Sequence, residues 1–365
     1  MIRFLDEYRN PELARQLVER IRHRPIEGLR FMEFCGGHTA AIMKHGLRQL
    51  LYPKVELLSG PGCPVCVTAI SDLDKAIALA REPEIIVATF GDMLKVPGSY
   101  SSLQKTRAEG GDVRVVYSPL DALEIAQRNP EKSVVFIGIG FETTAPAIAA
   151  SLLDAKNQGV TNFFLLSLHK LCPPVIKVLL DSGEIKIDGI ICPGHVSVII
   201  GSHPYEFIPR DYGIACVIAG FEPLDILLAI DMLVGQIERT QPEVEIAYRR
   251  GVTSDGNTQA KRIMEQVFKV DKADWRGIGI VPESGLRLRE EYQAFDAEST
   301  FPVELPPALE PKGCLCGEIL RGVITPLDCK LFGKSCTPEY PVGPCMVSSE
   351  GTCAAYFLYG DNHGR

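Results

Sequence analysis

The stretch Gly60-Pro61-Gly62-Cys63-Pro64-Val65-Cys66 places two cysteines three positions apart within a turn rich in glycine and proline. The residues before it, Val55–Ser59, form a mostly apolar run that predicts a strand. After it, apolar residues recur at helical spacing between Ala69 and Ala80. The stretch therefore connects a strand to a helix, and it is the unit from which we build the fold.

The two thiols of this turn lie close to the start of the predicted helix. The helix dipole and the free N–H groups there favour a thiolate, so we expect the pKa of these thiols to be lowered. A thiolate pair can exchange disulfides or hold a soft metal. The alternative is an incidental pair of buried cysteines, and the surrounding glycines and prolines, which expose backbone and side chains together, argue against it.

Length and composition limit the class of protein. The 365 residues are 46% hydrophobic and 23% charged, which is ordinary for a globular protein of two or three domains. No uninterrupted apolar run reaches the ~18 residues that a membrane span needs. The start, Met1–Glu7, lacks a signal-peptide pattern, so we expect a cytoplasmic protein. A net charge of −8 without a basic run argues against nucleic acid as the main partner.

Eight short apolar segments, most of them without alternation, predict strands of parallel sheets that are buried on both faces. They are Phe31–Phe34, Val55–Leu58, Ile85–Thr89, Val113–Tyr117, Val134–Gly138, Phe163–Leu166, Gly189–Cys192 and Ala215–Ala219. Their spacing of roughly 25–30 residues fits βαβ units.

We therefore predict an α/β fold of two similar Rossmann-like parallel-sheet domains that face a central cleft, followed by a C-terminal helical and iron–sulfur cluster region. The predicted domains are residues 1–130, residues 131–235 and residues 236–365. The last region is expected to be helical over 236–295, with a proline-rich strap from Phe301 to Pro311 before the cysteine-rich tail.

Polar, glycine-rich loops follow the predicted strands. In open α/β sheets, ligands bind outside the carboxyl ends of the strands, so we place the chemistry in the cleft where these loops meet. Three loops carry suitable groups: Cys35-Gly36-Gly37-His38-Thr39, Gly140-Phe141-Glu142-Thr143-Thr144 and Pro193-Gly194-His195-Val196.

Cys35, His38, Cys63 and Cys66 are expected to face one cleft. The paired glycines after Cys35 let the backbone approach a ligand closely. Three thiols and an imidazole satisfy a tetrahedral zinc site. The same thiols also suit a thiol-redox site or an iron site. The residues alone leave these three alternatives open.

The second domain offers the acid and imidazole groups Glu142, His169, His195 and Glu222. If they converge on one mouth of the cleft, they can relay protons near neutral pH. Taken singly, each can cap or hydrogen-bond within its own loop, and for Glu222, Thr143 and Thr144 this is the preferred interpretation.

Twelve cysteines in a cytoplasmic chain indicate metal, cluster or redox roles, because disulfides are rare in a reducing compartment. Six lie in the tail, at Cys314, Cys316, Cys329, Cys336, Cys345 and Cys353. A [4Fe–4S] cluster takes four cysteine ligands, so a cluster beside a redox-active pair accounts for all six, and zinc with bridging thiolates is the alternative. The remaining Cys172, Cys192 and Cys216 lie in apolar surroundings and are expected to be inert.

Five motifs together resemble the HypD family of hydrogenase formation proteins, which help to build the metal centre of [NiFe]-hydrogenases. They are Cys35 to Thr39, Gly60 to Cys66, Gly140-Phe141-Glu142-Thr143-Thr144-Ala145-Pro146, Pro193 to Val196, and the tail from Cys336-Thr337-Pro338 to Cys353. The resemblance runs nearly from end to end. One departure is Ala40, where many family members carry a second histidine.

The resemblance implies a scaffold on which an Fe(CN)2CO unit is assembled together with the small chaperone HypC, with cyanide arriving from the HypE–HypF system. It matches Cys35 to the family cysteine that holds iron jointly with a cysteine of HypC. It likewise matches Cys63 and Cys66 to a thiol pair, and His38 to the motif histidine. Because this iron must later leave, an open site of soft thiolates suits it better than a closed zinc tetrahedron.

A second resemblance is to ferredoxin:thioredoxin reductase, where a cluster stands next to a dithiol, and it implies electron flow from the tail cluster to Cys63 and Cys66. With the family analogy, the expected cluster ligands are Cys314, Cys329, Cys336 and Cys353. The expected iron ligands are Cys35, Cys63 and Cys66. The residues expected to take part in catalysis are Cys35, His38, Thr39, Cys63, Cys66, Glu142, His195, Cys316 and Cys345.

Two other functions stay open at this point. One is a thiol–disulfide oxidoreductase of the ferredoxin:thioredoxin reductase type that delivers no iron. The other is an interaction scaffold stabilised by zinc. Metal and sulfide analysis of anaerobically purified protein separates all three.

Overall fold

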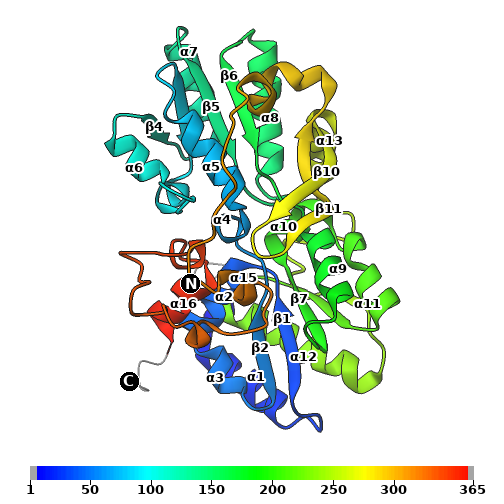
Figure 1. Ribbon diagram of the computed structural model, residues 1–365. Coiled ribbons are helices and arrows are strands. Elements are labelled where there is room, and N and C mark those ends of the chain that lie inside the picture. The colour runs from blue at the N-terminus through cyan, green and yellow to red at the C-terminus, as the bar shows by residue number, and fades with distance from the viewer. Residues whose placement is uncertain (1–5, 361–365) are drawn as a thin grey trace.

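Two α/β lobes, each built on its own parallel sheet, form the body of the protein, and a C-terminal region lies beside the lower lobe (Figure 1). The computed structural model describes residues 6–360. Most of the Met1–Glu7 stretch therefore lies outside the description, as do residues 361–365. The predicted α/β class with two parallel-sheet domains is confirmed.

The lower lobe contains a five-stranded sheet of order β2-β1-β7-β8-β9, and every neighbouring pair in it is parallel. The strands are β1 Leu29–Glu33, β2 Val55–Ser59, β7 Gly189–Pro193, β8 Ala215–Ala219 and β9 Val244–Ile246. The helices are η1 Asp6–Arg9, α1 Pro11–Arg22, α2 Gly36–Lys44, α3 Leu47–Leu51, α9 Cys172–Ser182, α10 Gly194–Ile200, η3 His203–Tyr205, α11 Phe207–Tyr212 and α12 Pro223–Arg239.

The upper lobe contains a four-stranded parallel sheet of order β4-β3-β5-β6. The strands are β3 Ile85–Thr89, β4 Asp112–Val115, β5 Ser133–Gly138 and β6 Phe163–Ser167. The helices are α5 Ile70–Leu79, η2 Gly91–Lys95, α6 Leu103–Ala108, α7 Pro119–Arg128, α8 Ala145–Asn157, α13 Thr258–Val267, η4 Glu290–Phe295 and α14 Ala297–Thr300. The short α4 Pro64–Val67 stands where the chain passes between the lobes (Figure 1).

The division of the strands between the sheets differs from the predicted domains 1–130 and 131–235. The chain leaves the lower sheet after β2, builds the whole upper sheet from β3 to β6, and returns to complete the lower sheet with β7 and β8. A buried apolar run predicts that a strand exists, but it carries no information about which strand lies beside it. The return of the chain has a direct consequence for the site, because it brings the loops after β1, β2, β7 and β8 to one sheet edge.

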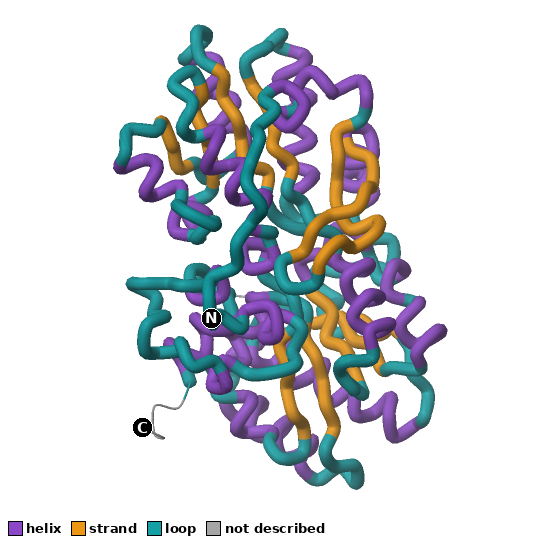
Figure 2. Tube along the Cα trace, in the orientation of Figure 1, coloured by secondary structure: helices purple, strands orange, loops and turns teal. Residues whose placement is uncertain are grey.

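Residues 236–295 were predicted to be helical, and this prediction is wrong for much of the segment. It contains the antiparallel hairpin of β10 Phe268–Trp275 and β11 Gly279–Leu288. The hairpin crosses from one lobe to the other (Figure 2). Its tip pairs with the chain just after α4, through a bridge between Trp275 and Thr68, and its second strand pairs with the loop after β6, through a bridge between Gly285 and Lys170.

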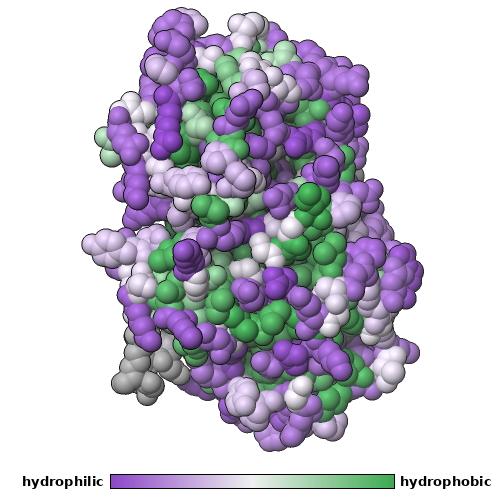
Figure 3. Space-filling view, in the orientation of Figure 1, coloured by the Kyte–Doolittle hydropathy of each residue, from purple (hydrophilic) through white to green (hydrophobic). Residues whose placement is uncertain are grey.

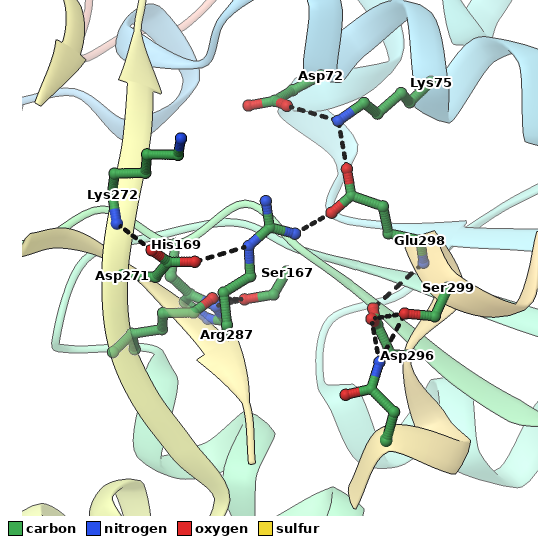
Figure 4. A network of polar contacts seen from close by, with 12 residues as sticks. Asp72, Lys75, Ser167, His169, Asp271, Lys272, Arg287, Asp296, Glu298 and Ser299 are labelled. Atoms are coloured by element: carbon green, nitrogen blue, oxygen red, sulfur yellow. Dashed lines mark hydrogen bonds and ion pairs between the residues drawn. The ribbon is translucent and has the colours of Figure 1, made fainter. Parts of the chain in front are cut away.

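A charged network fixes the hairpin to the upper lobe (Figure 4). Lys75 of α5 lies 3.7 Å from Asp72 and 2.5 Å from Glu298 of α14. Arg287 of β11 also pairs with Glu298 and lies 3.7 Å from Asp271 of β10. The hairpin, α5 and α14 are therefore held together by one chain of ion pairs.

The C-terminal region follows a strap that runs down from the upper lobe beside the hairpin (Figure 1). Its short helices are α15 Cys316–Leu320, η5 Pro326–Asp328, η6 Pro344–Met346 and α16 Thr352–Tyr359. The last of these packs against α2 of the lower lobe. Buried residues of both lobes and the tail cysteines belong to one continuous apolar core.

In Figure 3, hydrophilic side chains cover most of the visible face, and exposed apolar groups are most continuous across the middle of the lower lobe. Among the helices of residues 6–360, none is both long enough and apolar enough to cross a membrane.

Candidate metal centre and thiol cluster

Cys35 is placed by the meeting of two glycine-rich loops. It follows β1 directly and is the N-cap residue of α2. Because β1 and β2 are parallel neighbours, the turn after β2 reaches the same sheet edge, and the amide of Gly36 donates to the carbonyl of Gly62 at 3.1 Å. A Cβ on Gly62 would collide with the backbone of Cys35, so the close approach requires glycine. The predicted meeting of these two loops is found.

His195 is the imidazole beside Cys35. It lies just after β7, the other neighbour of β1, and its Nδ1 is 3.4 Å from the Sγ of Cys35. Burial lowers the pKa of His195 to about 4, so the ring is neutral near pH 7. Burial also raises the pKa of the Cys35 thiol, and the carboxyls of Glu33 and Glu350 raise it further. The resting pair is thus a protonated thiol in contact with a neutral imidazole.

His38 holds α2 to the end of β8. Its Nε2 lies 2.9 Å from the carbonyl oxygen of Gly220 and 3.3 Å from that of Ala219. Its ring stacks on Phe221 with the centroids 5.0 Å apart. Burial and the nearby His195 lower its pKa to about 4. His38 is therefore a positioning residue in this structure.

The structure does not gather the predicted set Cys35, His38, Cys63 and Cys66 into one metal site. Within residues 6–360, no three His, Cys, Asp or Glu side chains are close enough together to hold a single metal ion. What stands at the sheet edge is one thiol with one imidazole, Cys35 with His195. The sequence predicts His195 as a candidate from the loop that carries it. The predicted domains place His195 in residues 131–235 and Cys35 in residues 1–130, whereas the structure brings the two together.

Glu33 is a site residue that the sequence reasoning missed. It is the last residue of β1, it is buried, and its carboxylate accepts hydrogen bonds from the amide of Cys35 at 2.7 Å and from the hydroxyl of Thr39. Burial raises its pKa to about 7, although the bonds from Thr39, Cys35 and Ser59 oppose the rise. A signal was available, because Glu33 is a charged residue inside the apolar run Phe31–Phe34 immediately before Cys35.

The tail closes over the start of α2. A Cβ on Gly36 would lie 2.6 Å from the Cβ of Glu350 and 2.7 Å from its carbonyl oxygen. Burial raises the pKa of Glu350. The first glycine after Cys35 therefore makes room for the tail, and a turn of the cysteine-rich region becomes part of the wall around Cys35.

The Cys63/Cys66 pair faces the tail cysteines. Cys63 is the N-cap residue of the four-residue α4, and Cys66 is fully buried within it. The Cys66 thiol is in hydrogen-bond contact with Cys345 and Cys63, and its Sγ lies 3.8 Å from the carbonyl oxygen of Pro344. Burial raises the pKa of Cys66 well above its ordinary value, so the expected lowering by the helix start is wrong for this thiol.

All six tail cysteines line one small apolar cavity together with Ile319, Leu331, Phe332 and Met346. They form a connected set, in which Cys314 contacts Cys316, Cys316 contacts Cys345, and Cys345 contacts Cys353. A Cβ on Gly343 would lie 2.6 Å from the Sγ of Cys314, so this glycine keeps the cavity open. Soft thiolates around a dry cavity are the donor set of a [4Fe–4S] cluster, whose corners spread its ligands farther apart than a single ion does. The residues fit that group.

The division of these six thiols into ligands and a redox pair stays a prediction. Cys316 and Cys345 are in contact with one another, as the predicted pair requires. Cys345 also contacts Cys353, which is assigned as a ligand. Cys345 is the tail cysteine that reaches Cys66, so it links the cavity to the dithiol of α4.

Glu142 lies at the start of α9. Its Oε1 accepts from the amide of Cys172 at 2.9 Å, and its Oε2 has no hydrogen-bond partner among residues 6–360. Burial raises its pKa to about 7. Cys172 interacts electrostatically with both Glu142 and Cys35, so it stands between them. The buried His169, expected in the same relay, instead hydrogen-bonds Ser167 at 3.0 Å.

The capping interpretation of the remaining polar residues is confirmed for two of them. Glu222 forms a capping box with Asp225 at the start of α12 and pairs with Arg9. Thr144 donates to the carbonyl of Ile139 or of Phe141 in its own loop, at 3.2 Å in each case. Cys192 and Cys216 lie with their sulfurs 3.4 Å apart in the core of the lower sheet, as expected for structural residues.

Comparison with known proteins gives the same family as the motifs. A family model named HypD, described as the hydrogenase formation hypA family, matches residues 12–360. The chain is 50% identical over 368 residues to the hydrogenase expression/formation protein HupD of Azotobacter chroococcum, covering 98% of this chain and 97% of that protein. It is 48% identical to the hydrogenase maturation factor HypD of Cupriavidus necator (98% and 97% covered) and 45% identical to that of Escherichia coli (98% of each). The chain belongs to the HypD family of hydrogenase formation proteins.

Proposed function

We propose that the protein acts in hydrogenase maturation as a scaffold on which the Fe(CN)2CO unit is assembled, with iron bound as cargo at Cys35. The observation that carries the proposal is the arrangement of thiols. Cys35 stands at one sheet edge, the Cys63/Cys66 pair follows in the adjoining loop, and Cys66 contacts Cys345 of the tail cavity. Membership of the HypD family supports it.

Within residues 6–360, the proposed iron site is incomplete. Cys35 offers one thiolate and His195 stands 3.4 Å from it, so further ligands have to come with the cargo or from a partner. A HypC-type chaperone that brings a second thiolate fits this requirement, and a HypE-type protein, supplied by HypF, fits the need for a cyanide donor. Soft thiolate ligation suits low-spin iron that must later be released.

The residues around Cys35 have separable tasks. His195, within hydrogen-bond distance of the thiol, relays the thiol proton when Cys35 binds iron and does not retain it, because its pKa is about 4. Glu33 fixes the backbone of Cys35 through its amide. Burial of the thiol keeps water away from the bound metal.

The tail cavity and the dithiol form the electron-supplying part of the proposal. Cys314, Cys329, Cys336 and Cys353 would hold a [4Fe–4S] cluster, which supplies single electrons when bound. Cys63 and Cys66 store two electrons as a dithiol, and closing their disulfide releases two electrons and two protons.

The test is anaerobic co-purification with the chaperone, followed by infrared spectroscopy and by iron and sulfide analysis. Bands in the CN and CO stretching region that vanish in Cys35→Ala, while the visible absorption of the cluster persists, support the proposal. Cys192→Ala, which removes a buried cysteine of the same sheet, is the matched control and should keep both signals. If Cys35→Ala retains the bands, the assignment of the iron site is wrong.

The contact of Cys66 with Cys345 also favours a second candidate, a thiol–disulfide oxidoreductase of the ferredoxin:thioredoxin reductase type. That function predicts iron and sulfide for one cluster, a Cys63–Cys66 bridge after mild oxidation, and no CN or CO bands in the co-purified complex. The infrared spectrum therefore decides between the two.

A further inference from the structure

Arg276, at the tip of the β10–β11 hairpin, is a buried cation with one unused donor. Its side chain is 1% exposed. Its Nε and Nη2 donate to one oxygen of Glu310 in the strap, at 3.2 and 3.0 Å. Its Nη1 is buried and has no hydrogen-bond partner within the described chain. An unsatisfied N–H on a buried charged group is unfavourable, so this donor is expected to have an acceptor.

The backbone of the hairpin tip fixes where this guanidinium lies. The amide of Arg276 donates to the carbonyl of Val67, directly after Cys66, at 2.9 Å. The next residue, Gly277, packs so closely on Gly317 of α15 that neither Cβ would fit. Arg321 donates to the carbonyl of Gly277. The tip is thus wedged between the dithiol helix and the Cys314–Gly317 segment of the tail.

Cys314 lies in the short segment between the two tail residues that hold the hairpin tip. Glu310, the ion-pair partner of Arg276, stands four residues before it, and Gly317, on which Gly277 packs, stands three residues after it. The carboxylate of Glu310 is 61% exposed, so water screens its charge more than that of the buried guanidinium. The less screened charge beside Cys314 is therefore the positive one.

We propose that Arg276 is a positioning and charge-tuning residue for the cluster of the tail cavity, directing its free N–H and its charge to the Cys314 side. This inference rests on the proposed function, because it requires that cluster. A reduced cluster carries one more negative charge than an oxidised one, and a fixed cation in a low-dielectric site favours the reduced form. Arg276 therefore raises the reduction potential of the cluster, so that the cluster accepts an electron more readily and becomes a milder reductant of the adjoining disulfide.

The experiment measures the reduction potential of the cluster in anaerobically purified full-length protein by spectroscopic redox titration. Arg276→Met removes the charge and keeps much of the side-chain volume, whereas Arg276→Lys keeps the charge. Glu310→Gln removes the compensating carboxylate. Arg128→Met, an exposed arginine of α7 that pairs only with a neighbour on its own helix, controls for the change in net charge.

At a fixed solution potential, Arg276→Met should have a reduced-to-oxidised ratio at least tenfold lower than the parent protein, equivalent to about 59 mV for one electron. Arg276→Lys should recover most of this ratio, Glu310→Gln should raise it by a smaller factor, and Arg128→Met should leave it unchanged. If Arg276→Met fails to assemble a cluster, the opposite shift in Glu310→Gln decides the question.

Two results overturn the inference while leaving the proposed function intact. One is an unchanged potential in Arg276→Met protein with full iron and sulfide content. The other is a shift in the same direction for Arg276→Met and Glu310→Gln. A parent protein that contains no iron and sulfide cluster contradicts the proposed function itself, and is distinguished by the metal analysis alone.

Discussion

At the scale of single residues, burial has opposite effects on the acids and on the histidines of the site. It raises the pKa of Glu33 and Glu142 to about 7 and lowers that of His38 and His195 to about 4. All four groups therefore favour their neutral forms, as expected where charge is desolvated. Near pH 7 the imidazoles of His38 and His195 are therefore uncharged, and the carboxyls of Glu33 and Glu142 are close to the midpoint of their titration.

Glu142→Gln should flatten the pH dependence of stability. The folded-state pKa of Glu142 is about 7 against an ordinary 4.5, so folding favours the protonated acid. The stability that it contributes is complete below pH 4.5 and is lost as the pH rises to 7, which amounts to about 3 kcal/mol. Urea unfolding at pH 5 and pH 8 should show the variant gaining stability relative to the parent at pH 8. Glu124→Gln, on the surface of α7, should show no such gain, and an unchanged pH slope in Glu142→Gln would contradict the assignment.

Replacing the two histidines should separate structure from chemistry. His38→Ala should lower the free energy of unfolding by about 1–3 kcal/mol, because it removes a buried bond that ties α2 to β8. His195→Ala should leave stability closer to the parent and reduce the CN and CO infrared bands of the co-purified complex, since the Cys35 thiol loses its proton acceptor. If both variants lost the infrared bands and the free energy of unfolding to the same extent, the structural role of His38 could not be separated from the chemical role of His195, and both assignments would be wrong.

At the scale of elements, the β10–β11 hairpin connects the loops that carry the chemistry. Its tip bonds the chain beside Cys66, and β11 bonds the loop before Cys172. Trp275 anchors the tip, fully buried against Phe141 and donating to Ser284 at 2.8 Å. The strand signal of the hairpin is weak in the sequence, because the alternation of apolar and charged residues in Phe268–Trp275 slips at the irregularity between Asp271 and Ala273.

Trp275→Ala should loosen the dithiol loop as well as the hairpin. The cavity it leaves costs about 3–5 kcal/mol, and the bridge to Thr68 loses its support. Hydrogen exchange should show reduced protection of the amides from Cys66 to Thr68. Val270→Ala, on the exposed part of β10, should leave that protection unchanged. Undisturbed protection in Trp275→Ala would show that the hairpin does not hold this loop.

Gly343→Ala should prevent the cluster from assembling while the chain still folds. The backbone φ of −121° at this position accepts alanine, so the effect comes from the methyl group, 2.6 Å from the Sγ of Cys314. Iron and sulfide content should fall at least severalfold with an unchanged unfolding midpoint of the metal-free protein. Gly235→Ala, within α12 and with only the flexible Arg239 nearby, should keep full content. Full content in Gly343→Ala would place the cluster elsewhere.

At the scale of the whole molecule, the eight predicted strands and the α/β class were available from apolar runs and their spacing. The partnership of Cys35 with His195 was not, since it depends on β7 pairing with β1 rather than with β6. The number of cysteines in the tail was enough to indicate a cluster or redox site. Their packing around one cavity depends on contacts such as that of Gly343 with Cys314, and such contacts produce no periodic pattern in the sequence. Local pattern predicts elements, and non-local pairing decides the site.

A fragment that ends at the predicted domain boundary, residue 130, should not fold on its own. A fragment of residues 6–130 would contain β1 and β2 without β7 and β8, and so would lack the centre of its sheet. Circular dichroism should show no cooperative unfolding for this fragment, and mixing with residues 131–360 should restore it. A cooperative transition in the isolated fragment would contradict the crossed topology.

The crossed topology also determines the order in which parts of the protein can fold during synthesis. Leaving the ribosome from its N-terminus, the polypeptide can finish the β3–β6 sheet while β1 and β2 still wait for partners. The imidazole at position 195 emerges about 160 residues after the thiol at position 35, and the tail that closes over this thiol comes last. The pocket around this thiol is thus the last part of the protein to be completed, so if it binds iron as proposed, it does so only once the tail has been made.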